Sequence, residues 1–529
     1  MYSVIKIKMK DLSCIFLHFV TIFVSVIFWN SGKAQSSRPN IIFMMSDDHA
    51  QKAISAYNSS LIKTPNIDRL AEEGALFVNS FVANSICSPS RAIMLTGKHS
   101  HLNGVLGNSE VFDGSQMTLP KILQKHGYYT AMVGKWHLKS QPTGFDFWKV
   151  LRGQGSYYGP SFISENDTVT YNRYVSDVTT DIAINALENW ERNKPFFLMY
   201  NHKAPHRTWM PDTKDLYMFE NVEFPLPENF YDDFEGRKAL LESDMRIKDM
   251  LYSWDMKMLP GQYDEESEKG GAYNRTSEWI ETLAQIWLSQ MTPDQRIAWD
   301  RYYVPRNNVL LVDSLRGKEL AEWMYQRYMH DYLKCVASVD RNIGRLFDYL
   351  EKNGLMENTI IVYTSDQGFY LGEHGLFDKR FMYEESFRTP LLIRYPSEIK
   401  AGTKINGMVQ NIDYAPTLLD LAGIEIPEEM QGESFRVLWN QKDAEWRDKL
   451  YYHYYEFPGA HLVNKHYGIR TKRYKLIHFY EMNEWELYDL KTDPLEMNNL
   501  YGKKEYSPLT DELKSDLNDL RKYYKVQQN

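Results

Sequence analysis

Residues 87–97 read Cys87-Ser-Pro-Ser-Arg91-Ala-Ile-Met-Leu-Thr-Gly97. Pro89 fits the first turn of a helix, where a backbone N–H would have no partner in any case. The stretch therefore predicts a helix that begins near Cys87. Free N–H groups and the helix dipole favour an anionic ligand or a nucleophile at such an N-terminus. The alternative is a buried structural thiol, but such thiols seldom have this flanking proline and arginine.

Around this helix, short apolar runs alternate with helical patterns, which predicts a mostly parallel sheet flanked by helices. Residues 40–45, 195–200 and 359–364 are the clearest candidates for buried strands. Asp47-Asp48 follows the first of these runs, and Asp366-Gln367 follows the third. Because the carboxyl ends of parallel strands share one edge of a sheet, these polar groups can meet in one crevice.

Four oxygen-bearing side chains at these strand ends suggest a metal site. The carboxylates of Asp47, Asp48 and Asp366 and the amide oxygen of Gln367 are hard ligands, which suit Ca²⁺. No Cys/His pair has the spacing typical of a zinc site. An Asp-Asp pair alone is more often a helix cap or a solvated turn. Together with Cys87, the four residues indicate metal binding.

Cys-x-Pro-Ser-Arg followed by Thr-Gly resembles the signature of type I sulfatases. The resemblance implies that a formylglycine-generating (sulfatase-maturating) enzyme oxidises Cys87 to formylglycine, whose hydrated aldehyde attacks sulfur. It also implies that Asp47, Asp48, Asp366 and Gln367 bind Ca²⁺ together with this residue. Members of the family more often have Asn or His where this chain has Gln367. The implied fold is α/β, with a large alkaline-phosphatase-like mixed sheet flanked by helices and a smaller C-terminal α+β domain.

Lysine and histidine side chains complete the expected catalytic set. Cleavage of a sulfate ester needs positive charge on the sulfonyl oxygens and a proton for the leaving alkoxide. The resemblance implies that Lys135 and Lys379 hold the sulfate and that His206 protonates the leaving oxygen. It further implies that His137 polarises or deprotonates the hydrate and that Arg91 holds the formylglycine in place. For any one of these residues alone, the alternative is a solvated or structurally hydrogen-bonded side chain.

The C-terminal part of the chain is expected to complete the substrate pocket. Residues 378–392 resemble the corresponding stretch of N-acetylglucosamine-6-sulfatases. Residues 451–456 and 466–470 concentrate aromatic rings, His, Glu and Arg, which suit the binding of a sugar. From these segments we predict that His453, His466 and Arg470 bind substrate. The alternative is that most of these side chains pack the second domain.

These observations predict a sulfatase that removes the 6-O-sulfate of N-acetylglucosamine from heparan-type or mucin-type glycans. Heparan N-sulfatase and iduronate 2-O-sulfatase are alternative substrate assignments. A phosphodiesterase or phosphonate hydrolase of the same superfamily is an alternative reaction class. The third possibility is an inactive glycan-binding relative, which would have no need to retain every reacting group.

Chain length, net charge and the N-terminal segment give expectations about the domains, the location and the partners of the protein. The 529 residues predict a catalytic domain over residues 35–431 and a C-terminal domain over 432–529. Residues 1–34 resemble a signal peptide, with an uncleaved membrane anchor as the alternative. We therefore expect export to the periplasm, the cell surface or the medium, or a lysosomal-type location in a eukaryote. The net charge of −9 argues against broad attraction to nucleic acid, and we expect no stable membrane partner.

Overall fold

The computed structural model describes residues 38–258, 277–313, 315–440 and 444–527. Residues 39–529 form one compact unit. The expected signal peptide, residues 1–34, lies outside the described residues. Among the helices that are described, none is both long enough and apolar enough to cross a bilayer.

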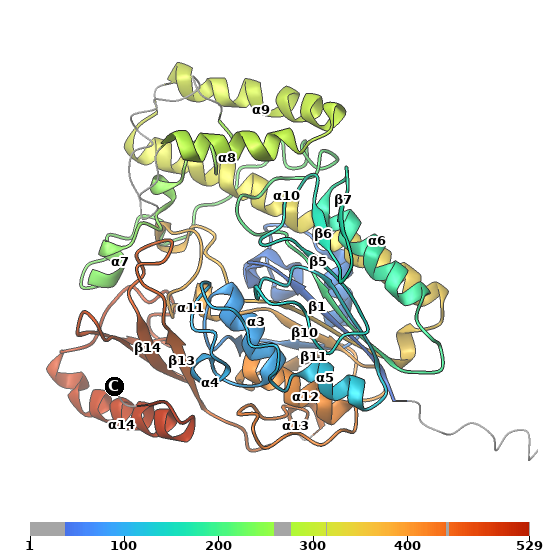
Figure 1. Ribbon diagram of the computed structural model, residues 1–529. Coiled ribbons are helices and arrows are strands. Elements are labelled where there is room, and N and C mark those ends of the chain that lie inside the picture. Colours follow the sequence, from blue (N-terminus) through green and yellow to red (C-terminus); the bar gives the residue numbers. More distant parts are fainter. Residues whose placement is uncertain (1–37, 259–276, 314, 441–443, 528–529) are drawn as a thin grey trace, which may run out of the picture. The chain divides into compact units, whose positions relative to one another are not determined.

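A ten-stranded sheet is the centre of this unit, with the strand order β11-β2-β10-β9-β1-β8-β4-β5-β6-β7 (Figure 1). Its strands are β1 (Asn40–Ser46), β2 (Ala75–Phe77), β4 (Tyr129–Gly134), β5 (Phe147–Leu151), β6 (Ser161–Ile163), β7 (Thr168–Thr170), β8 (Phe196–Asn201), β9 (Thr359–Ser365), β10 (Leu391–Arg394) and β11 (Thr403–Ile405). A small second sheet pairs β3 (Ser80–Phe81) with β12 (Val409–Gln410). The large mixed sheet confirms the predicted fold class.

Strand β1 lies between β8 and β9 and is parallel to both. All of its side chains are buried because helices cover both faces of the sheet. The register pairs Ser46 with Ser365 and Met45 with Asn201, so the three strands end at the same edge. The loops that follow β1, β8 and β9 therefore start side by side.

Successive residues of β1 point into two different cores. Ile42 and Met44 pack with helices α2, α6 and α10, whereas Ile41 and Phe43 pack with α3, α5 and α12. The helices are α2 (Pro65–Glu72), α3 (Cys87–Thr96), α4 (Ser100–Asn103), α5 (Leu119–Lys125), α6 (Val175–Glu188), α7 (Lys238–Glu242), α8 (Ser277–Ser289), α9 (Pro293–Asp313), α10 (Gly317–Lys352), α11 (Glu384–Phe387), α12 (Tyr414–Leu421), α13 (Val437–Asn440) and α14 (Ser507–Tyr523). The long α10 crosses the sheet beside α6 (Figure 1).

The C-terminal region forms a separate antiparallel sheet with the strand order β13-β14-β15-β16. Its strands are β13 (Lys449–Tyr454), β14 (His466–Thr471), β15 (Tyr474–Phe479) and β16 (Glu484–Asp489). One face packs on Phe381 and Phe387 of the preceding part of the chain. The other face packs on Leu513 and Leu517 of α14 (Figure 1). This confirms the smaller α+β region, while the boundary at residue 432 stays a prediction.

The face of this sheet toward the large sheet buries an acid, Glu486. The hydroxyls of Tyr383 and Tyr488 donate to its Oε2 at 2.5 and 2.8 Å, and its side chain is fully buried. Burial raises the pKa of Glu486 from 4.5 to about 7. Between these two values the folded protein keeps a proton that the unfolded chain releases. The residue therefore lowers stability progressively as the pH rises through this window.

We expect Glu486→Gln to remove this part of the pH dependence, because the amide resembles the protonated acid in shape and charge. Relative to the variant, the wild-type protein should lose up to roughly 3 kcal/mol of unfolding free energy between pH 4.5 and pH 7. Denaturant unfolding at a series of pH values measures the difference. Glu481→Gln, which changes an exposed acid in the turn between β15 and β16, is the control. Parallel pH profiles for wild type and Glu486→Gln would contradict the assignment.

Candidate active site

Cys87 is the first residue of helix α3, and its side chain is buried beneath the carboxyl edge of the large sheet. The Sγ atom lies 3.6 Å from Oδ1 of Asp47 and donates to it. Burial raises the pKa of the Cys87 thiol well above its usual range, although Lys379 opposes this effect. The thiol is therefore neutral, and as a free cysteine it is not an activated nucleophile.

Three carboxylates meet beside Cys87. Asp47 and Asp48 follow the end of β1 and Asp366 follows the end of β9, so the register of these strands brings them together. One oxygen from each lies within 4.8 Å of the others, and all three residues are fully buried. Gln367 donates from Nε2 to Oδ1 of Asp48. Its Oε1 is buried and has no hydrogen-bond partner among the described residues.

Each carboxylate is paired with a cation from a different part of the chain. Arg91 donates from Nε and Nη2 to Oδ2 of Asp366, at 3.1 and 2.8 Å. Lys135, which follows β4, bonds to Oδ2 of Asp47. Lys379 Nζ lies 2.7 Å from both oxygens of Asp48. These pairs compensate charges that would otherwise be very costly to bury.

The three acids differ in how readily they ionise. Burial opposes ionisation of Asp47, but the neighbouring Lys135, His206 and Arg91 hold its pKa well below the usual range. Burial raises the pKa of Asp48 to about 7 despite Lys379. Burial and the charge of Asp47 raise the pKa of Asp366 to about 6. The cluster thus has a shortage of positive charge around Asp48 and Asp366.

Two histidines lie at the border of the cluster. His206 Nε2 is 3.8 Å from Oδ2 of Asp48, and Nδ1 lies 2.6 Å from the carbonyl of Arg207. Because a carbonyl only accepts, Nδ1 carries the proton and Nε2 is the atom that can bind or release another. His137 Nδ1 lies 3.3 Å from Oγ of Ser88. Burial lowers the pKa of both imidazoles well below the usual range.

Lys203 also belongs to this site, although the sequence analysis did not single it out. It follows β8, is almost fully buried, and places Nζ 4.9 Å from the ring centre of Tyr157. Burial and the charge of Lys135 lower the pKa of Lys203 to about 7. Its position three residues before His206, at the end of a buried strand, was the available signal.

A second polar group lies next to Lys379. Asp378 Oδ1 accepts from the backbone N–H of Lys379 at 2.8 Å and from Nε of Arg380 at 3.1 Å. His461 Nε2 lies 3.5 Å from Oδ2 of the same carboxylate. Arg380 Nη1 donates to the hydroxyl of Tyr454 at 3.1 Å. His461 was not expected from the sequence, because its contact with Asp378 joins residues that are far apart along the chain.

The three residues expected to bind substrate have their observed partners outside the carboxylate cluster, and their role stays a prediction. His453 stacks on Tyr455 with ring centres 3.6 Å apart. His466 is fully buried, with Nδ1 2.8 Å from the carbonyl of Asn464. Arg470 forms an ion pair with Glu384 at 3.2 Å. In the described part of the chain, none of the three forms an interaction with Cys87 or the three carboxylates.

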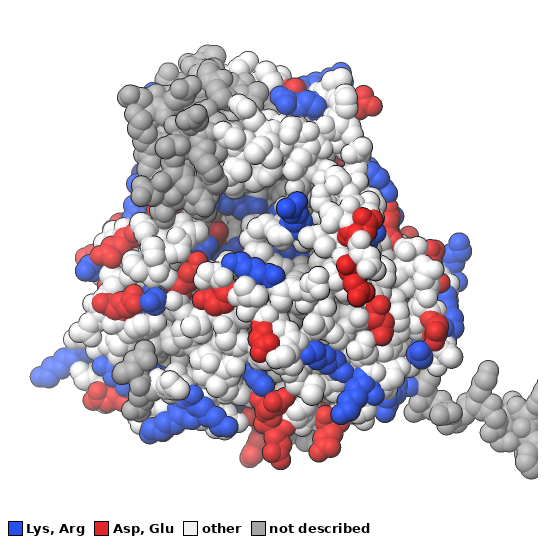
Figure 2. Space-filling view, viewed as in Figure 1, with Lys and Arg blue, Asp and Glu red and all other residues white. Residues whose placement is uncertain are grey.

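The face of the molecule shown in Figure 2 is hollowed near its middle. Lys and Arg side chains gather in and around this hollow (Figure 2). In the same view α3, the helix that begins at Cys87, lies just below it (Figure 1). A concentration of positive charge of this kind favours an anionic substrate on a chain whose net charge is negative.

Comparisons with known proteins identify the class to which this fold and site belong. A family model described as Sulfatase matches residues 39–424, which is most of the chain. A model described as N-sulphoglucosamine sulphohydrolase, C-terminal, matches residues 372–523. The chain belongs to the sulfatase family and is a sulfuric ester hydrolase.

Several individual relatives are described by the sulfated sugar on which they act. The chain is 50% identical over 505 residues to the N-acetylglucosamine-6-O-sulfatase of Bacteroides thetaiotaomicron, covering 94% of this chain and 88% of that protein. A solved structure described as a complex with its substrate D-glucosamine-2-N,6-O-disulfate matches with a TM-score of 0.87 and 50% identity, covering 93% and 99%. The N-acetylglucosamine-6-sulfatase of Capra hircus is 27% identical, covering 80% and 68%.

We expect Arg91→Lys to lower kcat/KM for an aryl sulfate by roughly 10- to 100-fold while the protein stays folded. Lysine keeps the charge but cannot reproduce the two-pronged contact with Asp366. Initial rates and circular dichroism measure the two quantities. Arg447→Lys, which changes a similar fork on Asp413, should lower the melting temperature and leave kcat/KM unchanged. Wild-type activity in Arg91→Lys would show that the two-pronged contact between Arg91 and Asp366 is not needed for activity.

Proposed function

We propose that this protein hydrolyses the 6-O-sulfate of glucosamine residues in sulfated glycans after export from the cytoplasm. The observation that carries the proposal is the fully buried cluster of Cys87, three carboxylates and their cations. The 50% identity to an N-acetylglucosamine-6-O-sulfatase and to a glucosamine-disulfate complex supports the choice of sugar and position. The basic and apolar composition of residues 1–34 supports export.

The residues of the cluster fit a calcium ion. Asp47, Asp48, Asp366 and Gln367 offer only oxygen ligands, and Oε1 of Gln367 has no partner among the described residues. The raised pKa values of Asp48 and Asp366 indicate carboxylates that a divalent cation would stabilise in their charged form. When present, Ca²⁺ and a formylglycine made from Cys87 supply Lewis-acid charge and a nucleophilic hydroxyl.

The remaining residues of the site provide charge and protons. Lys135 and Lys379 place positive charge beside the carboxylates, where the sulfonyl oxygens of a substrate would be held. His206 presents Nε2 to the same space and can pass a proton to the leaving oxygen. A bound sulfate favours the protonated imidazole and so offsets the low pKa that burial gives His206. His137 can accept a proton from the hydrate, and Arg91 fixes Asp366.

The side chains of Asp378, Arg380 and His461, which lie next to Lys379, are suited to binding the sugar. Asp378, Arg380 and His461 offer a carboxylate, a guanidinium and an imidazole, which together accept and donate hydrogen bonds to hydroxyl groups. Asp378 and Arg380 flank Lys379, the lysine that faces Asp48, and His461 contacts Asp378. We assign sugar recognition to this group because of these positions next to Lys379. Among the described residues, His453, His466 and Arg470 have their partners away from Lys379.

We expect mass spectrometry to find formylglycine at position 87 in protein made with a formylglycine-generating enzyme. Cys87→Ala should abolish turnover, because the neutral, buried thiol is useful only after its conversion. Cys335→Ala, a substitution of the other described and equally buried cysteine, is the control and should remain active. A fully active preparation that contains only the unmodified thiol would contradict the proposed role of formylglycine.

A panel of sulfated sugars tests the substrate. N-acetylglucosamine 6-sulfate and glucosamine 2-N,6-O-disulfate should both lose the 6-O-sulfate, and the second should keep its N-sulfate. Sugars carrying only an N-sulfate or a uronate 2-O-sulfate, and an aryl phosphodiester, should be poor substrates. Chromatography of the products decides between these outcomes. Loss of the N-sulfate or 2-O-sulfate with the 6-O-sulfate intact would reject the assignment and leave the sulfatase chemistry standing.

Two histidine variants separate the sugar-binding group from the packing residues. We expect His461→Ala to raise KM for the sugar sulfate roughly 10-fold, because each lost polar contact costs about 1 kcal/mol or more, and to change KM for an aryl sulfate little. His466→Ala is the matched control and should affect only stability, since the His466 ring packs against Phe381 and Phe479, whereas His461 lies beside Asp378. Equal effects of the two variants would contradict the assignment.

A further inference from the structure

A large groove lies between strand β11 and the edge of the C-terminal sheet. The groove has a volume of about 1010 Å³. Its charged lining residues are all cations: Lys400, Lys404, Arg447, Arg470 and Lys472. Among the described residues that line it, none is Asp or Glu. None of its cations interacts with Cys87 or with the carboxylates of the active site in the part of the chain that is described.

Three of these five cations are available for a ligand. Arg447 and Arg470 are used internally, because they form ion pairs with Asp413 and Glu384. Lys400, Lys404 and Lys472 are exposed and form no ion pair within the described ranges. Three uncompensated charges on one groove are notable in a chain whose net charge is −9.

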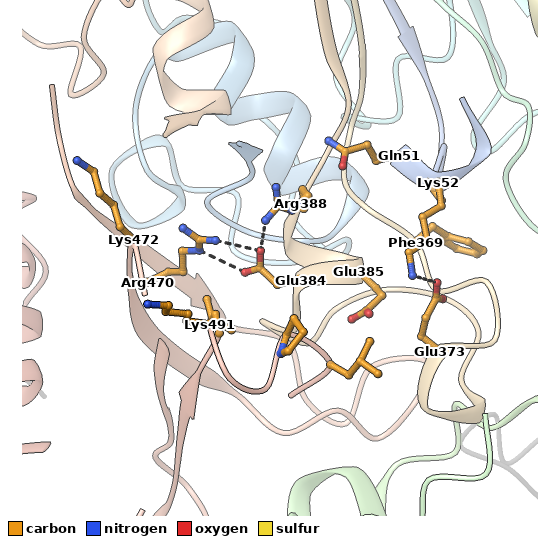
Figure 3. A pocket seen from close by; sticks show the side chains of 14 residues that line it. Gln51, Lys52, Phe369, Glu373, Glu384, Glu385, Arg388, Arg470, Lys472 and Lys491 are labelled. Atoms are coloured by element: carbon orange, nitrogen blue, oxygen red, sulfur yellow. Dashed lines mark hydrogen bonds and ion pairs between the residues drawn. The ribbon is translucent and has the colours of Figure 1, made fainter. Parts of the chain in front are cut away.

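A second cavity of about 400 Å³ shares Arg470 and Lys472 with the groove (Figure 3). Its lining is mixed in charge, because Glu373, Glu384 and Glu385 also line it. Lys491 lies on the same side of this cavity as those two residues (Figure 3). The opposite side is closed by the ion pair of Lys52 with Glu373 at 2.7 Å (Figure 3). The two cavities therefore meet at the C-terminal end of β14.

Aromatic and amide side chains accompany the lysines. The ring of Trp446 is partly buried beneath Arg447, whose Cζ lies 4.8 Å from the ring centre. Trp446 Nε1 donates to the carbonyl of Met408, which holds the indole in place. Asn79 and Asn406 also line the groove. Fixed rings pack on the apolar faces of sugars, amides read hydroxyl groups, and lysines attract sulfates.

We propose that this groove is an accessory binding site for a sulfated glycan chain, separate from the site of hydrolysis. The choice of a glycan rests on the proposed function, whereas the site itself rests on the groove and its cations. A polymer held here keeps its sulfated ends at a high local concentration around the enzyme. A substrate of one sugar gains nothing from the groove, because it contacts the active site alone.

The triple variant Lys400→Ala, Lys404→Ala, Lys472→Ala tests the proposal. Its matched control is Lys125→Ala, Lys352→Ala, Lys504→Ala, which removes three exposed lysines that also form no ion pair within the described ranges. Both are made in the full chain, alone and with Cys87→Ala to prevent turnover during binding. Calorimetry measures the affinity for a heparin octasaccharide, its fully desulfated form, and a DNA oligonucleotide of equal charge at physiological salt.

We expect the groove variant to bind the heparin octasaccharide at least about 10-fold more weakly than the control variant, a change of about 1.4 kcal/mol. Its KM for a sulfated polymer should rise several-fold, while kcat/KM for N-acetylglucosamine 6-sulfate stays unchanged. Equal heparin affinity in the two variants would overturn the proposal. Equal loss of affinity for DNA and heparin would overturn the assignment of a glycan. Failure of the proposed function would appear separately, as absence of 6-O-desulfation by the wild-type protein.

Discussion

The burial of three carboxylates within 4.8 Å of one another is the constraint on which the rest of this structure depends. Such a cluster is stable only if each charge has a partner, because full burial removes the carboxylates from bulk solvent. The partners come from separate parts of the chain: Arg91 from α3, Lys135 from the end of β4 and Lys379 from the loop after β9. The site and the topology of the large sheet therefore stabilise each other.

The convergence of this cluster could be predicted because it follows from local signals and one rule of sheet geometry. Apolar runs indicate the central strands, and parallel strands end at the same edge. Asp47 and Asp366 each come directly after such a run, and the observed pairing of Ser46 with Ser365 brings them together. Pro89 and its flanking residues predict where α3 begins. Each inference needed only neighbouring residues or a general property of sheets.

The surroundings of His453 and His466 could not be predicted in the same way, because they depend on which face of a strand a side chain occupies. In β13, Tyr452 and Tyr454 face the preceding part of the chain, and His453 lies on the opposite face near Tyr467. His466 is on the inner face but is covered by Phe381 and Phe479. The composition of β13 and β14 shows that both strands are rich in aromatic residues and histidines. It does not show which of these side chains are on the inner face of the sheet and which are on the outer face.

The C-terminal sheet is connected to the carboxylate cluster through the loop that contains Lys379 and Arg380. Tyr452 and Tyr454 lie on one face of β13, and their hydroxyls bond to the carbonyl and the guanidinium of Arg380, at 2.5 and 3.1 Å. Arg380 directly follows Lys379, the cation that faces Asp48. The position of Lys379 is thus coupled to β13 and to the residues that we propose bind the sugar. On the proposed assignment, we expect a change in β13 to alter substrate selection through Arg380 while Asp47, Asp48 and Asp366 keep their places.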